Sequence, residues 1–123
     1  MDKSLPVLVV DDSQTIRHII SEQLRTLGFT DIDQAEDGAA GLAKLGEKQY
    51  GLVLSDWEMQ PMSGEEFLKA VRQNARNRKV PVILITETTT RGTSLLAGAD
   101  AYLAKPFKPQ DLETAIKRVF VKK

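Results

Sequence analysis

Short apolar runs alternate along this chain with longer segments in which apolar residues recur at helical spacing. Several of the runs are continuous and rich in β-branched residues, which indicates strands that are buried on both faces of a sheet. Strands become buried in this way when helices cover both faces, as they do where parallel strands are joined by helical crossovers. The alternation therefore predicts an α/β fold of the (βα)5 type, a doubly wound sheet of five parallel strands.

The two periodicities also place the individual elements. The predicted strands cover residues 7–10, 32–35, 52–55, 80–86 and 101–103. The predicted helices cover residues 16–27, 38–45, 64–74 and 91–97, and a last helix begins at Pro109, a residue that suits a first turn. Gly28 follows the first helix as a C-terminal cap. The helix at 91–97 is short and contains poor helix formers, so we expect a shortened fourth helix region.

Length and charge limit what the chain can be. Its 123 residues suffice for one domain with a hydrophobic core, and we expect residues 1–123 to form a single domain. The 17 basic residues balance the 17 acidic ones, so charge gives no reason to expect binding to nucleic acid or to a membrane. We find no cysteine, no apolar stretch of membrane-spanning length and no signal peptide. We expect a cytoplasmic monomer.

Polar residues stand at the ends of four predicted strands. Asp11 and Asp12 follow the first strand, Asp56 the third, and Lys105 the fifth, whereas Thr86 ends the fourth. Ligands of open parallel sheets bind outside the carboxyl ends of the strands, near the point where the strand order reverses. Three carboxylates held there would repel one another unless a divalent cation lay among them. Oxygen ligands without histidine or cysteine favour Mg²⁺.

A phosphoryl group is a substrate that suits this set of residues. A metal among the acids would accept its oxygens, a carboxylate can attack phosphorus, and an ammonium and a hydroxyl would offset charge on the equatorial oxygens. Each residue also has a plainer interpretation. Adjacent acids often cap a helix, an aspartate after a strand is often a turn residue, and Thr86 suits a strand. Lys105 lies between an apolar strand and Pro106, which favours a buried anion as its partner.

The residues around these positions resemble the receiver domains of two-component response regulators. The similarity covers essentially the whole chain and rests on Val-Leu-Val-Val-Asp-Asp-Ser at 7–13, Ser-Asp-Trp-Glu-Met at 55–59, Ile-Thr at 85–86 and Tyr-Leu-Ala-Lys-Pro-Phe at 102–107. The Asp-Trp-x-Met stretch and Ala-Glu-Asp-Gly at 35–38 are similar to the single-domain chemotaxis regulators of the CheY type. The resemblance implies a flavodoxin-like, CheY-like sheet with the strand order 2-1-3-4-5.

The resemblance also implies which residues bind the phosphoryl group and the metal. Asp56 would be the phosphoacceptor. Asp11, Asp12 and the main-chain carbonyl of Glu58 would join Asp56 in binding Mg²⁺, the expected cofactor. Lys105 would contact the phosphoryl oxygens.

A switch is implied by the same resemblance. Thr86 would contact the phosphoryl oxygens together with Lys105, and the ring of Tyr102 would move inward when the Thr86 hydroxyl is drawn to the phosphate. The same ring can also simply pack in place as a strand residue. The bond between Lys105 and Pro106 would be cis, a geometry that an X-Pro bond adopts at modest cost.

The implied function is that of a phosphorylation-dependent signalling switch. A histidine kinase would be the phosphodonor, and hydrolysis would remove the group. The output would be binding to a downstream protein through the face made by helix four, strand five and helix five, in chemotaxis, with the flagellar switch as the leading candidate, or in a related two-component pathway. The chain would catalyse only its own phosphorylation and dephosphorylation, so it is not expected to be an enzyme that turns over a metabolite.

Two departures from the receiver pattern keep alternatives open. The span from Thr86 to Lys105 is 19 positions, about three fewer than receivers usually have, or roughly one helical turn. Glu87 stands where receivers favour a small residue. A constitutive adaptor that keeps the fold without switching, or a phosphate sink, is therefore an alternative. An aspartyl-phosphate hydrolase would need a general acid and a cap domain, and a flavin module would need a glycine-rich loop where Asp11 and Asp12 stand.

Overall fold

The computed structural model describes residues 3–74, 77–86, 98–105 and 107–121. Its elements are β1 (Val7–Val10), α1 (Gln14–Thr26), β2 (Ile32–Ala35), α2 (Gly38–Glu47), β3 (Leu52–Asp56), α3 (Gly64–Gln73), β4 (Val82–Thr86), β5 (Ala101–Ala104) and α5 (Pro109–Val121). The five predicted strands and four of the five predicted helices are present. The helix predicted at 91–97, Glu87 and the predicted cis bond at Pro106 lie outside the described residues.

The predicted strand boundaries differ from the structure at three points, of which two are single-residue extensions, of β3 to Asp56 and of β5 to Ala104. Strand β4 begins at Val82, two residues later than predicted. The main-chain N–H of Val80 donates to Asn77 O at 3.2 Å in a turn, and Pro81 has no N–H to give to a strand partner. The apolar run at this point is therefore longer than the strand it contains.

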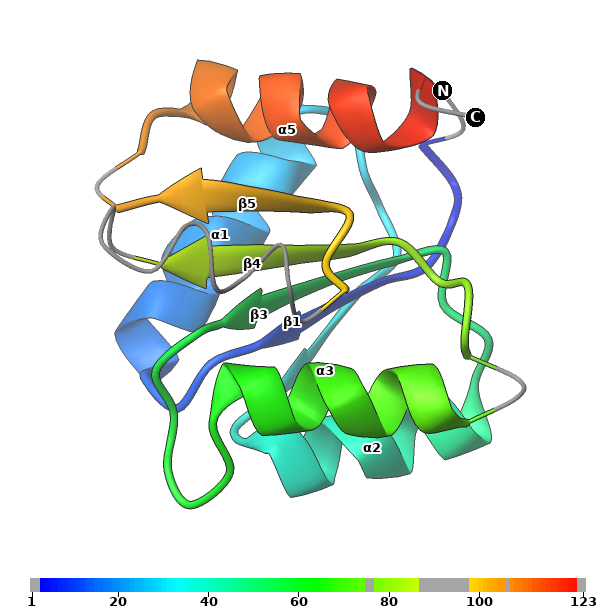
Figure 1. Ribbon diagram of the computed structural model, residues 1–123. Helices are drawn as coiled ribbons and strands as arrows, with labels where there is room; N and C mark the ends of the chain where they lie inside the picture. The colour runs from blue at the N-terminus through cyan, green and yellow to red at the C-terminus, as the bar shows by residue number, and fades with distance from the viewer. Residues whose placement is uncertain (1–2, 75–76, 87–97, 106, 122–123) are drawn as a thin grey trace.

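All five strands are parallel, and their order across the sheet is β2-β1-β3-β4-β5. Helices α1 and α5 cover one face of the sheet, and α2 and α3 cover the other, so the molecule has three layers (Figure 1). The strand order reverses between β1 and β3, because the chain adds β2 on one side of β1 and then β3 on the other. The fold class and strand order that the sequence predicts are confirmed.

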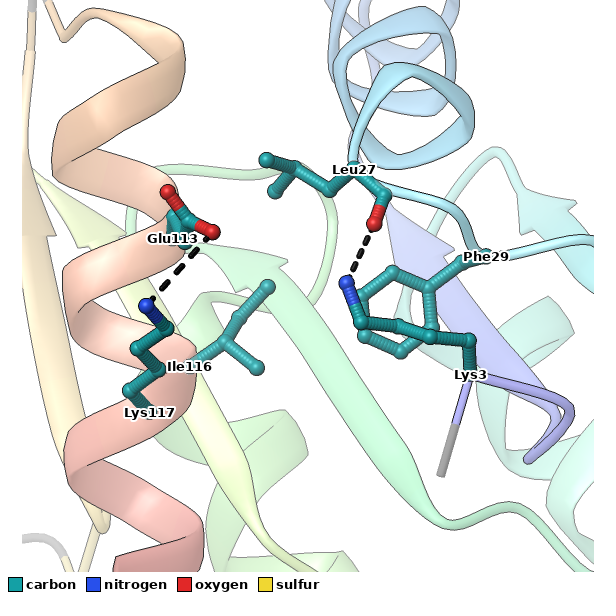
Figure 2. Close-up of a pocket in the computed structure, with 6 residues that line it drawn as sticks. All are labelled: Lys3, Leu27, Phe29, Glu113, Ile116 and Lys117. Carbon is teal, nitrogen blue, oxygen red and sulfur yellow. Dashed lines mark hydrogen bonds and ion pairs between the residues drawn. The ribbon is translucent and has the colours of Figure 1, made fainter. Parts of the chain in front are cut away.

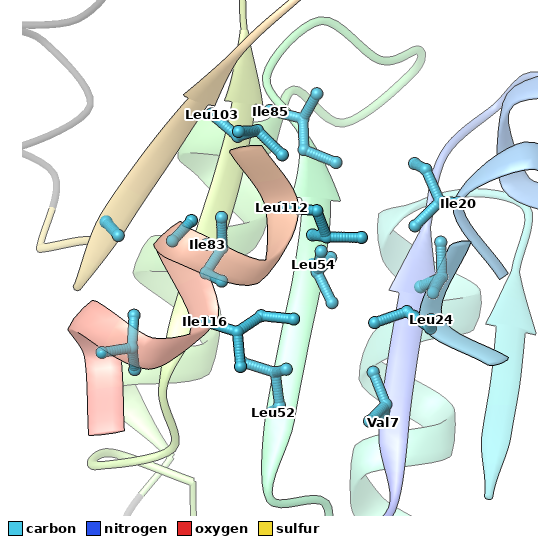
Figure 3. Close-up of a cluster of buried hydrophobic side chains, with 14 of the residues drawn as sticks. Val7, Ile20, Leu24, Leu52, Leu54, Ile83, Ile85, Leu103, Leu112 and Ile116 are labelled. Carbon is cyan, nitrogen blue, oxygen red and sulfur yellow. The ribbon is translucent and has the colours of Figure 1, made fainter. Parts of the chain in front are cut away.

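The hydrophobic core consists of one cluster on each face of the sheet. Side chains alternate between the two faces along each strand, so Val7 and Val9 pack towards α1 and α5 while Leu8 and Val10 pack towards α2 and α3. Figure 3 shows the first cluster, in which Leu112 and Ile116 of α5 lie against β3 and β4, alongside Ile20 and Leu24 from α1. Helices thus pack on both faces of the sheet, and these buried contacts hold the strands in position.

Helix termini follow from short polar signals in the sequence. The Ser13 side chain caps α1 by accepting the N–H of Ile16, and the Asp37 side chain caps α2 by accepting the N–H of Ala40. A capping box between Ser63 and Glu66 starts α3. Each helix therefore begins directly after a loop at the carboxyl edge of the sheet. Within the described residues, no helix combines the length and the apolar character that crossing a membrane requires.

Candidate functional site

Three carboxylates meet at the point where the strand order reverses. Val10 of β1 pairs with Ser55 of β3, so the next residues along the two strands, Asp11 and Asp56, lie side by side at the carboxyl edge. Each of Asp11, Asp12 and Asp56 offers a carboxylate oxygen, and these oxygens lie within 4.8 Å of one another. The sheet therefore brings together the three acids that the sequence singles out as metal ligands, with Asp11 and Asp56 buried and Asp12 exposed.

Asp11 carries a buried charge that the surrounding protein satisfies only in part. Its side chain is almost inaccessible, and its Oδ1 accepts the N–H of Ser13 at 2.8 Å. Its Oδ2 is buried without a hydrogen-bond partner among the described residues. Burial raises the pKa of Asp11 to about 6, and the nearby charges of Asp56 and Asp12 act in the same direction, against the Ser13 N–H and Lys105. A buried carboxylate that keeps one unpaired oxygen within a cluster of three acids fits a divalent cation.

Asp56 is paired with a lysine from the neighbouring part of the sheet. Its Oδ1 lies 3.1 Å from Nζ of Lys105, and its side chain is 8% exposed. Burial raises the pKa of Asp56, although the Lys105 ammonium and the main-chain N–H of Glu58 oppose that effect. Lys105 thus has the buried carboxylate of Asp56 as its partner, in agreement with the prediction of a buried anion beside it. One buried carboxylate with an ammonium on one side and two acids on the other suits nucleophilic attack on an anionic group.

Thr86 and Lys105 are joined through the backbone at the same edge. The N–H of Lys105 donates to Thr86 O at 2.9 Å, and Thr86 is buried. Thr86 pairs with Ala104, and Leu84 pairs with Tyr102. Because residues two apart on a strand share a face, Tyr102 lies on the same face of the sheet as Thr86, on the adjacent strand. The structure thus places Thr86 and Lys105 at the same edge as the acids, and Tyr102 two residues before the end of β5. The switch role of Thr86 and Tyr102 stays a prediction.

The loop after Asp56 forms an open pocket beside the acids. The pocket has a volume of about 290 Å³. It is lined by Asp12, Trp57, Glu58, Met59, Gln60 and Ser63. Glu58 is exposed at its rim, and the predicted role of its carbonyl as a metal ligand stays a prediction. The bond between Gln60 and Pro61 is cis. The pocket leaves the Asp12 side of the acidic cluster open to solvent.

Comparison with known proteins supplies the family. The response regulator receiver domain matches the chain over residues 7–117. This chain belongs to the response regulator receiver domains.

Relatives of this receiver domain cover nearly its whole length. It is 36% identical over 119 residues to the chemotaxis protein CheY of Pseudomonas aeruginosa, with 94% of this chain and 96% of that protein covered. It superimposes on the chemotaxis response regulator CheY4 of Vibrio cholerae with a TM-score of 0.87 and 35% identity, covering 94% of this chain and 98% of that one. The predicted identification as a CheY-type receiver is confirmed, and it makes the protein a phosphorylation-dependent response regulator.

A second similar structure has a metal at its site. It is the receiver domain of a Pseudomonas aeruginosa sensor histidine kinase, described with a magnesium ion coordinated in the active-site cleft. Its TM-score is 0.86 at 27% identity, with 96% of this chain and 98% of that chain covered. The acidic cluster of this receiver, with the unpaired Oδ2 of Asp11, is chemically suited to the same kind of ion.

Two residues that shape the site carry no functional signal in the sequence. Gly64 begins α3, and its N–H donates to Trp57 O at 2.8 Å; a Cβ there would overlap Asp56 O and lie 2.7 Å from Trp57 Cα. Only glycine lets the helix approach the strand that carries Asp56. Arg17 of α1 donates from Nη1 to the main-chain oxygen of Asp11 at 2.6 Å. Neither contact follows from spacing along the chain, since both depend on how the elements pack.

A second pocket lies at the opposite end of the sheet. It has a volume of about 140 Å³ and is lined by Lys3, Leu27, Phe29, Glu113, Ile116 and Lys117 (Figure 2). Nζ of Lys3 donates to Leu27 O and lies 5.0 Å from the centre of the Phe29 ring. Because Leu27 and Phe29 connect α1 to the start of β2, this pocket is at the amino edge of the strands. It is therefore separate from the acids.

Proposed function

We propose that this receiver accepts a phosphoryl group on Asp56 from a histidine kinase, with Mg²⁺ as cofactor, and passes the signal on by binding another protein. The observation that carries the proposal is the geometry of Asp56. Its buried carboxylate lies 3.1 Å from the Lys105 ammonium and within 4.8 Å of two further carboxylates. Such an arrangement serves a reaction in which one acid attacks and the others hold a cation.

The transfer exchanges one bond to phosphorus for another. A carboxylate oxygen of Asp56 forms a bond to phosphorus while the bond from phosphorus to the kinase histidine nitrogen breaks, and that nitrogen keeps the electron pair. Lys105 offsets charge on the phosphoryl oxygens, and the Thr86 hydroxyl offers a hydrogen bond to one of them. Bound Mg²⁺ supplies positive charge for these oxygens. Hydrolysis of the acyl phosphate returns the carboxylate, so the chain catalyses only its own modification.

Asp11 and Asp12 hold the cation in this scheme, together with Asp56 and the carbonyl of Glu58. The Oδ2 of Asp11 has no protein partner among the described residues and is free to bind a metal without breaking another contact. The solved receiver with magnesium in its cleft supports this assignment by similarity. A cation here also removes the mutual repulsion that helps raise the pKa of Asp11 and Asp56.

Output follows from Thr86 and Tyr102 in the proposed scheme. Drawing the Thr86 hydroxyl towards a phosphoryl group changes the space next to Tyr102 on the same face of β4 and β5. The face that includes β5 and α5 then changes its affinity for a downstream protein. Relatives named as chemotaxis proteins support chemotaxis as the pathway.

The test is a fluorescence titration of Trp57, the one tryptophan of the chain, which lines the pocket beside Asp12. Mg²⁺ is added first and beryllofluoride, which mimics an acyl phosphate, second. Changes at both steps support the proposal if Asp56→Asn abolishes the second. Mass spectrometry after treatment with a small phosphodonor should show one added phosphoryl group in the wild type and none in the variant. No beryllofluoride response despite a Mg²⁺ response would instead favour a constitutive adaptor.

A further inference from the structure

We propose that Arg17 is a positioning residue that sets the Asp11 carboxylate for the cation, an inference that rests on the proposed function. Arg17 lies on the second turn of α1, and its guanidinium makes two contacts in different directions. Its Nη1 donates to the main-chain oxygen of Asp11 at 2.6 Å, and its Nε donates to Oε1 of Gln34 on β2 at 3.3 Å. The side chain thereby ties the end of β1 to the helix that follows it and to the neighbouring strand.

The contacts of Asp11 show what this bond completes. Its N–H donates to Ala35 O at 3.2 Å, and its Oδ1 accepts the N–H of Ser13 at 2.8 Å. With the carbonyl held by Arg17, the peptide groups on both sides of Asp11 are fixed, and so is one side-chain oxygen. Only Oδ2 is without a partner among the described residues. The backbone and one oxygen of Asp11 are thus anchored, while Oδ2 stays unpaired in a residue of the acid cluster.

Arg17 acts on the geometry of the site and not as a counter-ion within it. Among the described residues, its hydrogen bonds go to a main-chain oxygen and an amide oxygen, and no ion pair joins it to a carboxylate. The positively charged side chain that pairs with an acid of the site is that of Lys105, whose partner is Asp56. Replacing Arg17 by lysine keeps the positive charge but removes the planar, two-point contact, so the two variants separate charge from position.

Partners that orient a metal ligand affect affinity more than chemistry. Loss of such a contact weakens metal binding by about 10- to 100-fold in other sites. For Arg17→Ala we therefore expect the Kd for Mg²⁺ to rise by about tenfold or more. Once Mg²⁺ is saturating, the Asp11 oxygen is held by the ion itself, so the response to beryllofluoride should return to within about twofold of the wild type.

The experiment measures Mg²⁺ binding by Trp57 fluorescence and Mn²⁺ binding by electron paramagnetic resonance in four proteins besides the wild type. Arg17→Ala and Arg17→Lys should both bind the ion more weakly. Gln34→Ala should show a smaller loss, because Arg17 keeps its bond to Asp11. The matched control is Arg25→Ala, which removes an exposed arginine of the same helix that pairs with Glu22, and it should bind Mg²⁺ as the wild type does.

Three results would overturn the inference. The first is a folded Arg17→Ala variant with wild-type Mg²⁺ affinity. The second is wild-type affinity in Arg17→Lys, which would assign the effect to charge alone. The third is a beryllofluoride response that stays impaired at saturating Mg²⁺, which would indicate general damage to the site. Should Arg17→Ala not fold, Arg17→Lys and Gln34→Ala carry the test. If the wild type itself binds no Mg²⁺, the proposed function fails first, which distinguishes the two failures.

Discussion

Replacing Asp11 by asparagine should stabilise the metal-free protein at neutral pH. The buried carboxylate has one oxygen without a protein partner and lies beside two other acids. Asparagine keeps an oxygen for the Ser13 N–H and places a neutral amide nitrogen where the unpaired oxygen stands. The substitution therefore removes a buried charge and leaves the existing hydrogen bond in place.

The size of the effect follows from the pKa of Asp11, which burial raises from its usual 3.8 to about 6. Each pKa unit corresponds to about 1.4 kcal/mol, so ionised Asp11 lowers the free energy of unfolding by about 3 kcal/mol at most. Because the folded pKa is raised, the protein has its full stability below pH 3.8, where Asp11 is protonated in both states. That part of the free energy of unfolding is lost as the pH rises through about 6. Burial of the amide offsets part of the gain, so we expect a net increase of about 1–2 kcal/mol above pH 6.

Urea unfolding in EDTA, repeated between acidic and neutral pH, measures the difference. The advantage of Asp11→Asn over the wild type should be small near pH 4 and reach a plateau above pH 6. Adding Mg²⁺ should reduce it, because the ion stabilises only the protein with the complete acid cluster. The control is Asp12→Asn, which removes an exposed charge of the same cluster and should have a smaller effect.

Two outcomes would refute this reasoning. If Asp11→Asn were less stable than the wild type in EDTA at neutral pH, the contacts of the carboxylate would outweigh its burial. If Asp12→Asn gave an equal gain, repulsion within the cluster would be the main cause, and the burial of Asp11 would be secondary.

Three further predictions concern residues outside the cluster of Asp11, Asp12 and Asp56. Gly64→Ala should lower the free energy of unfolding by about 1–3 kcal/mol and weaken the beryllofluoride response, since the added Cβ overlaps the backbone of Asp56. Arg72→Ala should cost about 2–4 kcal/mol in urea unfolding, because it removes donors to three main-chain carbonyls and to Asp100, and lysine should not restore them. Tyr50→Phe should raise the pKa of Asp33 in an NMR titration, since the Tyr50 hydroxyl, 2.6 Å from Asp33, is the main cause of its lowered pKa. The free energy of unfolding that the wild type loses as the pH falls through the pKa of Asp33 should be smaller in the variant.

The fold could be predicted because its determinants are local. Continuous β-branched runs such as 52–55 and 82–86 can be buried on both faces only in a helix-covered parallel sheet, and the amphipathic stripes between them supply the helices. The site could be predicted for the same reason: parallel strands bring their carboxyl ends to one edge, so Asp11, Asp56 and Lys105 had to converge.

The supporting contacts could not be predicted in this way. In the sequence, Arg72 is an ordinary basic residue in the last turn of α3. In the structure, its guanidinium donates to Gly98 O, Arg78 O, Val80 O and Asp100, which belong to segments that come together only in the folded protein. Its importance depends on tertiary geometry, and periodicity contains no information about that. The same holds for Gly64, whose lack of a side chain matters only because Asp56 lies beside it.

The distribution of unsatisfied charge gives the proposed order of events at the site. At the amino edge of β4 and β5, Arg72 donates to backbone oxygens and forms an ion pair with Asp100, so the charges of these two residues offset each other. At the carboxyl edge, the three acids have one ion pair to a lysine within the described residues, that of Asp56 with Lys105, and burial raises the pKa of Asp11 and Asp56. A phosphoryl group would add further negative charge beside Asp11 and Asp12. Under the proposed function, the Lys105 ammonium offsets only part of that charge. We therefore expect a cation to bind before or together with phosphoryl transfer, and phosphorylation in EDTA to fail even with an excess of phosphodonor.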